Sequence, residues 1–362
     1  MKCYVLVHPG LEKICQQEIK ELLGGKVLLS PALVEFELTT ISQLPIIISR
    51  LQSPRRILVS LGKYSEVNDI NFDKFTFPWP DFLPRQFSFK VEVLGVKGMD
   101  NRIELAKTVA AKLFPVLEKN GFVPQLELKK PDLLLVLLYN GQEYFLGWDC
   151  CGREIDARDY RVFPHSASFK GDLAYYFMRL SGFKASEKLL VGFVRDGGLA
   201  IEAALWANSR PVRNLMAYSC TKFPAFSPVP ILSSSQATSA TTKTIVYGFD
   251  SNGQSIIAAR KNVKIAGAAD FVQVQKCALD ELDVRYTESE FDRLIVHVTT
   301  KDEDKLNELY YQASYVLKAK GTLLLIARPG LEVMAPKKFM LQDSQEIARG
   351  ESKYKVWRMG KK

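Results

Sequence analysis

The chain has 362 residues, of which 47% are hydrophobic, 25% charged and 11% aromatic. This composition is typical of a globular protein of two or three domains and excludes a disordered or fibrous chain. Lys and Arg number 49 against 40 Asp and Glu, so the formal charge is +9, which is compatible with a polyanionic partner without proving one. No apolar run approaches the roughly 18–20 residues of a membrane span, and we expect neither a membrane partner nor a secretory signal.

Cysteine and histidine offer little material for a metal site. The six cysteines at positions 3, 15, 150, 151, 220 and 277 form no C-x-x-C motif, and the three histidines at 8, 165 and 297 lie far apart in sequence. We therefore expect free, mostly structural thiols, a cytoplasmic protein and no metal.

Residues 1–54 predict a small α+β module. A strand at Cys3–Val7 is followed by apolar residues at helical spacing from Leu11 to Leu23, and Gly24-Gly25 ends that helix. Val34–Leu38 alternates apolar and acidic residues, which predicts a returning strand with one buried face.

Residues 55–152 predict a second α+β module with stronger elements. Phe87–Val93 alternates as a half-buried strand does, and an apolar stripe from Ile103 to Leu117 predicts a helix that bends near Pro115. The apolar run Leu133–Tyr139 predicts a buried strand, and Asn140-Gly141 predicts a hairpin turn into the next one.

Beyond a linker at 153–168, residues 169–362 alternate strand-like and helix-like stretches, which predicts a doubly wound α/β sheet. The expected strands are Leu189–Phe193, Thr244–Asp250, Phe271–Val274, Leu294–Val296, Thr322–Ala327 and a last one near Lys353–Lys362. A stretch rich in Pro, Ser and Thr at 208–243, which includes Ser233-Ser234-Ser235, predicts a mobile loop inside this domain.

Several short motifs follow one another in a recognisable order. They are Lys129-Lys130-Pro131-Asp132, then Asp159–His165 with Phe169–Ala174, then Ile201–Ala204, then Gly248-Phe249-Asp250 with Ala258–Asn262. In this order the chain resembles the THUMP-domain RNA methyltransferases, and more specifically those that methylate N2 of guanosine in transfer RNA. The resemblance covers nearly the whole chain.

The resemblance implies a fold and an RNA partner. The fold is an N-terminal ferredoxin-like module at 1–54, a THUMP domain at 55–152, the linker at 153–168 and a Rossmann-like class I methyltransferase fold at 169–362. The partner is transfer RNA or another structured RNA, held by a basic face. The candidate RNA-binding residues are Lys97, Arg102, Lys129, Lys130, Tyr160 and Arg161. Tyr160 has two interpretations, stacking on a base or packing between domains.

The cofactor loop departs from the family pattern. Family members end the first strand in an Asp-Pro-Phe-Cys-Gly-Ser-Gly-Thr type of loop around S-adenosylmethionine. This chain has Val191 at the acid and Arg195 at the first glycine, where a side chain is expected to crowd the pocket. Gly197 and Asp250 are retained and are the candidate cofactor residues, although a turn and a helix cap explain them as well. In family members an acid after the third strand faces the adenine of the cofactor. The matching position in this chain is Cys277, and Asp280 comes too late in the sequence to occupy it.

The catalytic motif is absent. Where the family carries Asn-Pro-Pro-Tyr or Asp-Pro-Pro-Tyr after the fourth strand, this chain reads His297-Val298-Thr299-Thr300. The lost acceptor and aromatic are the groups that orient the target amine and stack on the flipped base. If the chain is active, His297 or Asp292 lies near that amine; otherwise His297 is structural.

Three hypotheses follow. The first is a catalytically degenerate RNA-binding member of the family, with no assigned cofactor, that assists another RNA-modification protein or a ribonucleoprotein. The second is an active S-adenosylmethionine-dependent guanosine-N2 methyltransferase with divergent motifs. The third, an enzyme that uses NAD or another nucleotide, ranks last because no G-x-G-x-x-G follows a strand.

Overall fold

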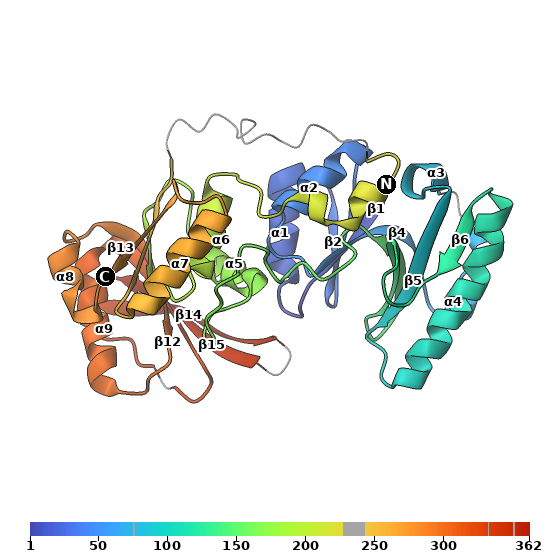
Figure 1. The fold of residues 1–362 in the computed structure, drawn as a ribbon. Helices are drawn as coiled ribbons and strands as arrows, with labels where there is room; N and C mark the ends of the chain where they lie inside the picture. Colours follow the sequence, from blue (N-terminus) through green and yellow to red (C-terminus); the bar gives the residue numbers. More distant parts are fainter. Residues whose placement is uncertain (75–76, 227–242, 332, 350–351) are drawn as a thin grey trace. The chain divides into compact units, whose positions relative to one another are not determined.

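The computed structural model describes residues 1–74, 77–226, 243–331, 333–349 and 352–362. The chain divides into two compact units (Figure 1). The first comprises Met1–Asp156 with Arg213–Ser233, and the second comprises Ala157–Val212 with Ser234–Lys362.

The first unit is built on an eight-stranded sheet with the order β2-β3-β1-β4-β8-β7-β5-β6. Its strands are β1 (Lys2–Leu6), β2 (Val27–Ser30), β3 (Leu33–Glu37), β4 (Arg56–Tyr64), β5 (Gln86–Leu94), β6 (Val123–Leu126), β7 (Leu133–Tyr139) and β8 (Tyr144–Asp149). Its helices are α1 (Glu12–Leu23), α2 (Leu44–Arg50), α3 (Trp79–Phe82) and α4 (Met99–Lys119). Helix α1 packs on β2 and β3, and α4 packs on β5 and β6.

One continuous sheet joins the segments 1–54 and 55–152. Strand β1 pairs antiparallel with β4, with Cys3 opposite Val59, and β4 pairs in turn with β8. Tyr4 and Phe145 meet edge to face at 5.3 Å in the shared core. The expected strand at Leu133–Tyr139 and the hairpin at Asn140 are both present, and α4 continues through Pro115.

The segment after Arg213 packs on the first unit, so the prediction that 208–243 is a loop inside the C-terminal domain is wrong for residues 213–226. The amide of Cys220 donates to Cys150 O at 2.8 Å, and Phe223 lies edge to face with Phe82 at 5.4 Å. These long-range contacts replace the hydration that a free loop would have. Ser233-Ser234-Ser235 lies outside the described residues.

The second unit has a seven-stranded sheet with the order β11-β10-β9-β12-β13-β15-β14. Its strands are β9 (Leu189–Gly192), β10 (Val246–Asp250), β11 (Val272–Lys276), β12 (Phe291–Val298), β13 (Leu317–Ala327), β14 (Phe339–Arg349) and β15 (Ser352–Lys361). Its helices are α5 (Gly171–Leu180), α6 (Gly198–Ala207), α7 (Gly253–Ile265), α8 (Leu282–Arg285) and α9 (Glu303–Val316).

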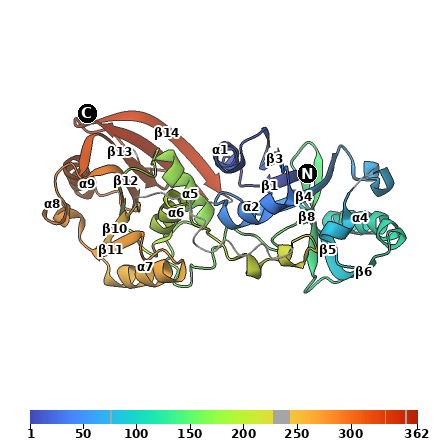
Figure 2. The same ribbon diagram turned by 90° about the horizontal axis from the view of Figure 1, so that it is seen from above.

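The predicted α/β class is confirmed for the second unit. Strands β9 to β13 pair in parallel, and β15 and β14 complete the sheet antiparallel. Helices α5 to α7 cover one face and α8 and α9 the other, as a doubly wound sheet requires (Figure 2). Among the described residues, no helix is long and apolar enough to span a membrane.

Candidate functional site

The carboxyl ends of the parallel strands of the second sheet meet at one edge. Strand β9 lies between β10 and β12, so the strand order reverses beside it. In open α/β sheets, ligands bind in the crevice at such a switch point, outside the carboxyl ends of the strands. The residues that follow β9, β10 and β12, therefore, form the candidate site.

Arg195 occupies the space beside β9 and β12. Its Nη1 donates to Ala167 O at 2.5 Å and to Nδ1 of His297, and its Nη2 donates to His297 O at 3.1 Å. The side chain is buried, at 8% exposure, and burial lowers the pKa of its guanidinium. Arg195 also has φ +53°, a conformation that costs an L-residue roughly 1 kcal/mol. The expectation that Arg195 crowds this loop agrees with these contacts.

The cavity left beside Arg195 has a volume of about 20 Å³. It is lined by residues of the β9 loop, by Phe169 and by His297. A water needs about 10–15 Å³ by this measure, whereas small-molecule sites span roughly 300–1,000 Å³. This space therefore holds about one water and no larger group.

His297 is held as a neutral ring. It stacks on Phe169 with ring centroids 4.5 Å apart, and burial together with Arg195 lowers its pKa to about 3. Because a guanidinium only donates, Nδ1 is the acceptor and the ring proton is on Nε2. Among the described residues, the buried Nε2 has no hydrogen-bond partner.

Asp250 stands at the end of β10, where the sequence predicted it. Its Oδ2 accepts from the backbone N–H of Arg195 at 3.0 Å, and its Oδ1 accepts from the N–H of Asn252 at 2.9 Å. The carboxylate is buried, at 6% exposure. These two hydrogen bonds connect the β9 loop to the start of α7, so Asp250 has a structural role here.

Gly197 is required by packing. It has φ +83°, and a Cβ at this position would lie 3.2 Å from both Cα and Cβ of Ala259 on α7. A side chain would therefore separate the start of α6 from α7.

A second, larger cavity of about 610 Å³ lies at the same edge. Its lining comes from the ends of β9 to β12 and from α9 and includes Phe193, Ser251, Asp280, Val298 and Leu306. Asp280 reaches this cavity, whereas Cys277 is packed in the core at 1% exposure. Cys277, which the resemblance matches to the adenine-facing acid, therefore does not line this cavity, whereas its neighbour Ala278 does.

These residues do not fit the whole of S-adenosylmethionine. The family pattern places the cofactor beside the loop after the first strand, and here the Arg195 guanidinium and the His297 ring fill that space. The larger cavity is of a size to take a nucleoside. Beside the β9 loop, the space of about 20 Å³ leaves no room for the reactive end of the cofactor.

Asp292 lies away from this edge, which corrects the hypothesis that it stands near a target amine. It is near the start of β12, and five strand residues of about 3.3 Å each separate it from His297, roughly 16 Å. Its carboxylate binds Nζ of Lys318 at 2.8 and 2.9 Å and accepts from Lys188 N.

The linker at 153–168 is held by hydrogen bonds to residues of the second unit. Glu202 Oε1 accepts from Arg158 Nε at 2.7 Å and from the Tyr160 hydroxyl at 2.6 Å. Arg161 Nε donates to Asp196 Oδ2 at 2.7 Å. Tyr160 is 4% exposed and presents no ring face to a base, so its interpretation as a stacking residue is corrected to one of packing.

Asn262 completes this arrangement. Its Nδ2 donates to the backbone oxygens of Phe163 and Asp196, both at 2.9 Å, and its Oδ1 accepts from Phe163 N. Sequence reasoning used Glu202 and Asn262 as landmarks of the fold and missed their role. Their polarity inside otherwise apolar helix faces was the available signal.

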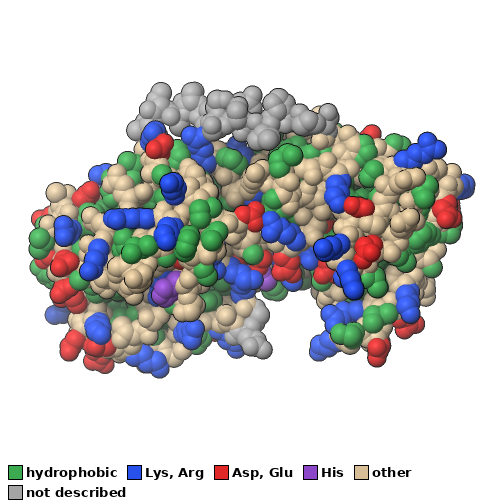
Figure 3. Space-filling view, viewed as in Figure 1, with side chains coloured by type: hydrophobic (Ala, Val, Ile, Leu, Met, Phe, Trp, Pro, Cys, Tyr) green, Lys and Arg blue, Asp and Glu red, His purple; other side chains and the backbone are tan. Residues whose placement is uncertain are grey.

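The four lysine and arginine candidates of the first unit are exposed but fall into two groups. Lys97 and Arg102 follow the end of β5 at the start of α4, whereas Lys129 and Lys130 precede β7. Because β5 and β7 run parallel, these groups lie at opposite ends of a seven-residue strand, roughly 23 Å apart. On the face shown in Figure 3, Lys and Arg side chains are spread over both units.

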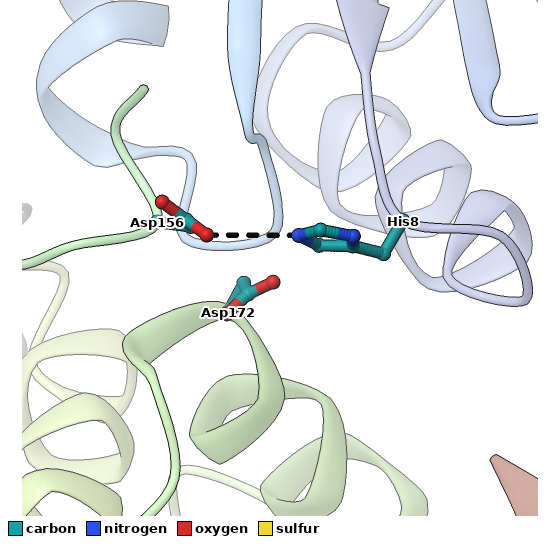
Figure 4. Close-up of side chains that lie close together, drawn as sticks. All are labelled: His8, Asp156 and Asp172. Atoms are coloured by element: carbon teal, nitrogen blue, oxygen red, sulfur yellow. Dashed lines mark ion pairs between the residues drawn. The ribbon is translucent and has the colours of Figure 1, made fainter. Parts of the chain in front are cut away.

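Two further arginines of the first unit, Arg55 and Arg56, take part in ion pairs within it. Arg56 is buried and binds Asp149 at 2.6 Å and Glu92 at 3.1 Å, and Arg55 pairs with Glu154. His8, which follows β1, has its Nε2 3.6 Å from Oδ2 of Asp156 (Figure 4). Asp172, drawn in the same view, belongs to the second unit, where it accepts from Arg349 Nε at 3.2 Å.

The fold and the strand order of the second unit define a class I methyltransferase fold. Residues 158–331 match a family model described as UPF0020: RMKL-like, methyltransferase domain. The predicted resemblance to RNA methyltransferases is therefore confirmed for the part of the chain that this family model covers.

Two kinds of curated relative are similar to the chain. A tRNA (guanine(6)-N2)-methyltransferase of Methanocaldococcus jannaschii is 24% identical over 80% of this chain and 79% of its own length. A ribosomal RNA large subunit methyltransferase K/L of Desulfotalea psychrophila is 26% identical over 74% of this chain. The match covers 39% of that relative, so the chain spans about two fifths of its length.

Solved structures share the fold over the whole chain. TrmN from Thermus thermophilus aligns with a TM-score of 0.72 at 19% identity, covering 100% of this chain and 99% of that one. A possible methylase from Clostridium difficile 630 aligns with a TM-score of 0.76 at 17% identity, covering 100% and 98%. SMU.472, a putative methyltransferase complexed with SAH, aligns with a TM-score of 0.73 at 18% identity, covering 99% and 97%.

Proposed function

We propose that this protein binds structured RNA, with transfer RNA as the first candidate, and does not transfer methyl groups. In this role it assists another RNA-modification protein or a ribonucleoprotein. The first unit supplies the RNA-binding surface, and the second unit serves as a folded platform of the methyltransferase class.

The filling of the cofactor space carries the proposal. The guanidinium of Arg195 is bound by Ala167 O and His297 O, and about 20 Å³ remains beside it. A methyl donor needs its reactive end held near the target amine, since positioning supplies much of the rate. His297 is neutral and bound to Arg195, so neither group is poised to act on an amine.

Charge and family support an RNA partner. The formal charge is +9, and Lys97, Arg102, Lys129 and Lys130 are exposed at two ends of the first sheet. Cationic side chains that neutralise phosphates release counterions and drive association at low salt. The similar proteins named above include a tRNA and a ribosomal RNA methyltransferase.

One observation favours the alternative of an active guanosine-N2 methyltransferase. The cavity of about 610 Å³ beside Ser251 and Asp280 has room for a nucleoside at the edge where the class binds its cofactor. In that case Arg195 would have to leave its site, breaking its hydrogen bonds to Ala167 and His297.

An assay on one RNA separates the two functions. Unmodified transfer RNA is incubated with the protein and S-adenosylmethionine, binding is followed by fluorescence anisotropy, and the RNA is analysed by mass spectrometry. The proposal predicts binding that weakens with salt and no methylated guanosine. Methylated guanosine in the RNA contradicts the proposed loss of methyl transfer. Absence of RNA binding at low salt contradicts the proposed RNA-binding role.

A further inference from the structure

A cavity of about 570 Å³ lies in the first unit, between the start of α4 and the β7–β8 hairpin. One wall is the helix face that carries Asn101, Glu104, Leu105 and Thr108, spaced at one helical repeat. The other wall carries Tyr139 and Tyr144 and the turn that follows β4.

The aromatic wall is built by strand pairing. Tyr139 and Tyr144 face each other across the β7–β8 ladder, with ring centroids 4.7 Å apart and an interplanar angle of 34°. The Tyr139 hydroxyl donates to Gly141 O at 3.0 Å, which fixes one ring over the hairpin. The cavity therefore has a rigid aromatic side.

A glycine allows the helix to begin beside these rings. Gly95 has φ +78°, and a Cβ there would lie 1.9 Å from Tyr139 O. Only glycine permits the chain to pass this close to β7 before it turns through Val96 and Lys97 into α4. Lys97 and Arg102, which are both exposed, follow directly in sequence the lining residues Val96 and Asn101.

We propose that this cavity takes an unpaired nucleobase of the RNA strand that the first unit binds; the inference rests on the proposed function. Single-stranded bases are recognised by stacking on aromatic rings and by hydrogen bonds to their edges. Tyr139 and Tyr144 supply the rings, Glu104 accepts from an exocyclic amine or ring N–H, and Asn101 and Thr108 supply further polar groups.

The flanking charges fit the backbone of such a strand. Lys97 and Arg102 lie beside the first turn of α4, a 21-residue helix whose N-terminal N–H groups attract anions. The carboxylates of Glu66 and Glu104 at the cavity disfavour a phosphate inside it and favour an amine-bearing base edge.

The test compares two RNA hairpins that share a stem, one blunt and one with a short single-stranded 3′ extension carrying 2-aminopurine. The full chain and the variants Tyr144→Leu and Glu104→Gln are titrated by anisotropy and by 2-aminopurine fluorescence. Glu118→Gln, on an exposed position later in α4, is the matched control. Near-ultraviolet circular dichroism verifies that each variant is folded.

The wild type is expected to prefer the extended hairpin and to quench 2-aminopurine on binding. Tyr144→Leu is expected to weaken binding of the extended hairpin by about fivefold or more and to leave the blunt one unchanged. Equal binding of both hairpins, or unchanged affinity in both variants, overturns the pocket while RNA binding stands. A wild type that binds neither hairpin overturns the proposed function and this inference together.

Discussion

Arg195 Nη2 donates a hydrogen bond to His297 O at 3.1 Å, and the ring of His297 accepts a second one from Nη1. These two residues stand at the positions where the family carries a loop glycine and the first residue of its catalytic motif. In the proposed function, this one interaction leaves no room for a methyl donor and also engages the residue at the position of the catalytic motif.

Removing the Arg195 side chain should reopen the site. We expect Arg195→Gly to raise the affinity for S-adenosylhomocysteine by tenfold or more, equivalent to about 1.4 kcal/mol, measured by calorimetry. The fold should tolerate the change, because glycine relieves the positive φ and so offsets part of the lost hydrogen bonds. Arg195→Lys is the control that keeps a long cation in place. If neither variant binds S-adenosylhomocysteine detectably, the Arg195 guanidinium is not what keeps the cofactor out.

His297 should stay neutral in acid. Its folded pKa of about 3 lies below the ordinary value of 6.5, so the folded state binds fewer protons than the unfolded one between these values. The contribution of His297 to the free energy of unfolding is therefore complete above pH 6.5. It is lost as the pH falls toward 3, by up to about 1.4 kcal/mol per pH unit. Histidine NMR signals recorded from pH 8 to 4 should include one that does not titrate. If no such signal is found, the buried arrangement of His297 is wrong.

The stability of the second unit should depend on the ion pair between Glu202 and Arg158 of the linker. Glu202→Gln leaves the Arg158 guanidinium, which is 0% exposed, without its carboxylate, and breaking such a buried pair costs about 3 kcal/mol. Urea unfolding should show this loss in the transition of the second unit. Glu346→Gln, on the exposed strand β14, is the control and should change stability by less than about 0.5 kcal/mol. A Glu202→Gln protein as stable as the control would contradict this role.

The two basic groups should act independently on RNA. Lys97→Ala with Arg102→Ala, and separately Lys129→Ala with Lys130→Ala, should each reduce the slope of log affinity against log salt by about 2. The combined variant should show the sum, because sites more than about 10 Å apart add. A salt slope that neither pair changes would place the RNA on another surface.

Elements with strong apolar patterns were predictable, and those completed by distant partners were not. Leu133–Tyr139 is a continuous apolar run and was found as β7, whereas β14 is mostly exposed and has no apolar alternation. Strand β4 begins at Arg56, which is buried only because Asp149 and Glu92 neutralise it from other strands. Such pairing cannot be read from local sequence.

The site was predictable in position but not in contacts. Asp250 was expected at a strand end and lies there, and the crowding by Arg195 was expected from the resemblance, which matches Arg195 to a loop glycine. Asp292 was misjudged, because nearness in sequence to His297 says nothing of which end of a strand a side chain occupies. Tyr160 was left open because its partner Glu202 lies 42 residues away.

Loss of cofactor binding can be tested by titrating the wild-type protein with S-adenosylmethionine in a calorimeter, with and without unmodified transfer RNA. We expect no heat of cofactor binding in either case, while the same RNA binds in the absence of cofactor. Cofactor binding that strengthens with RNA would contradict the proposed loss of the cofactor site and would favour the alternative of an active methyltransferase.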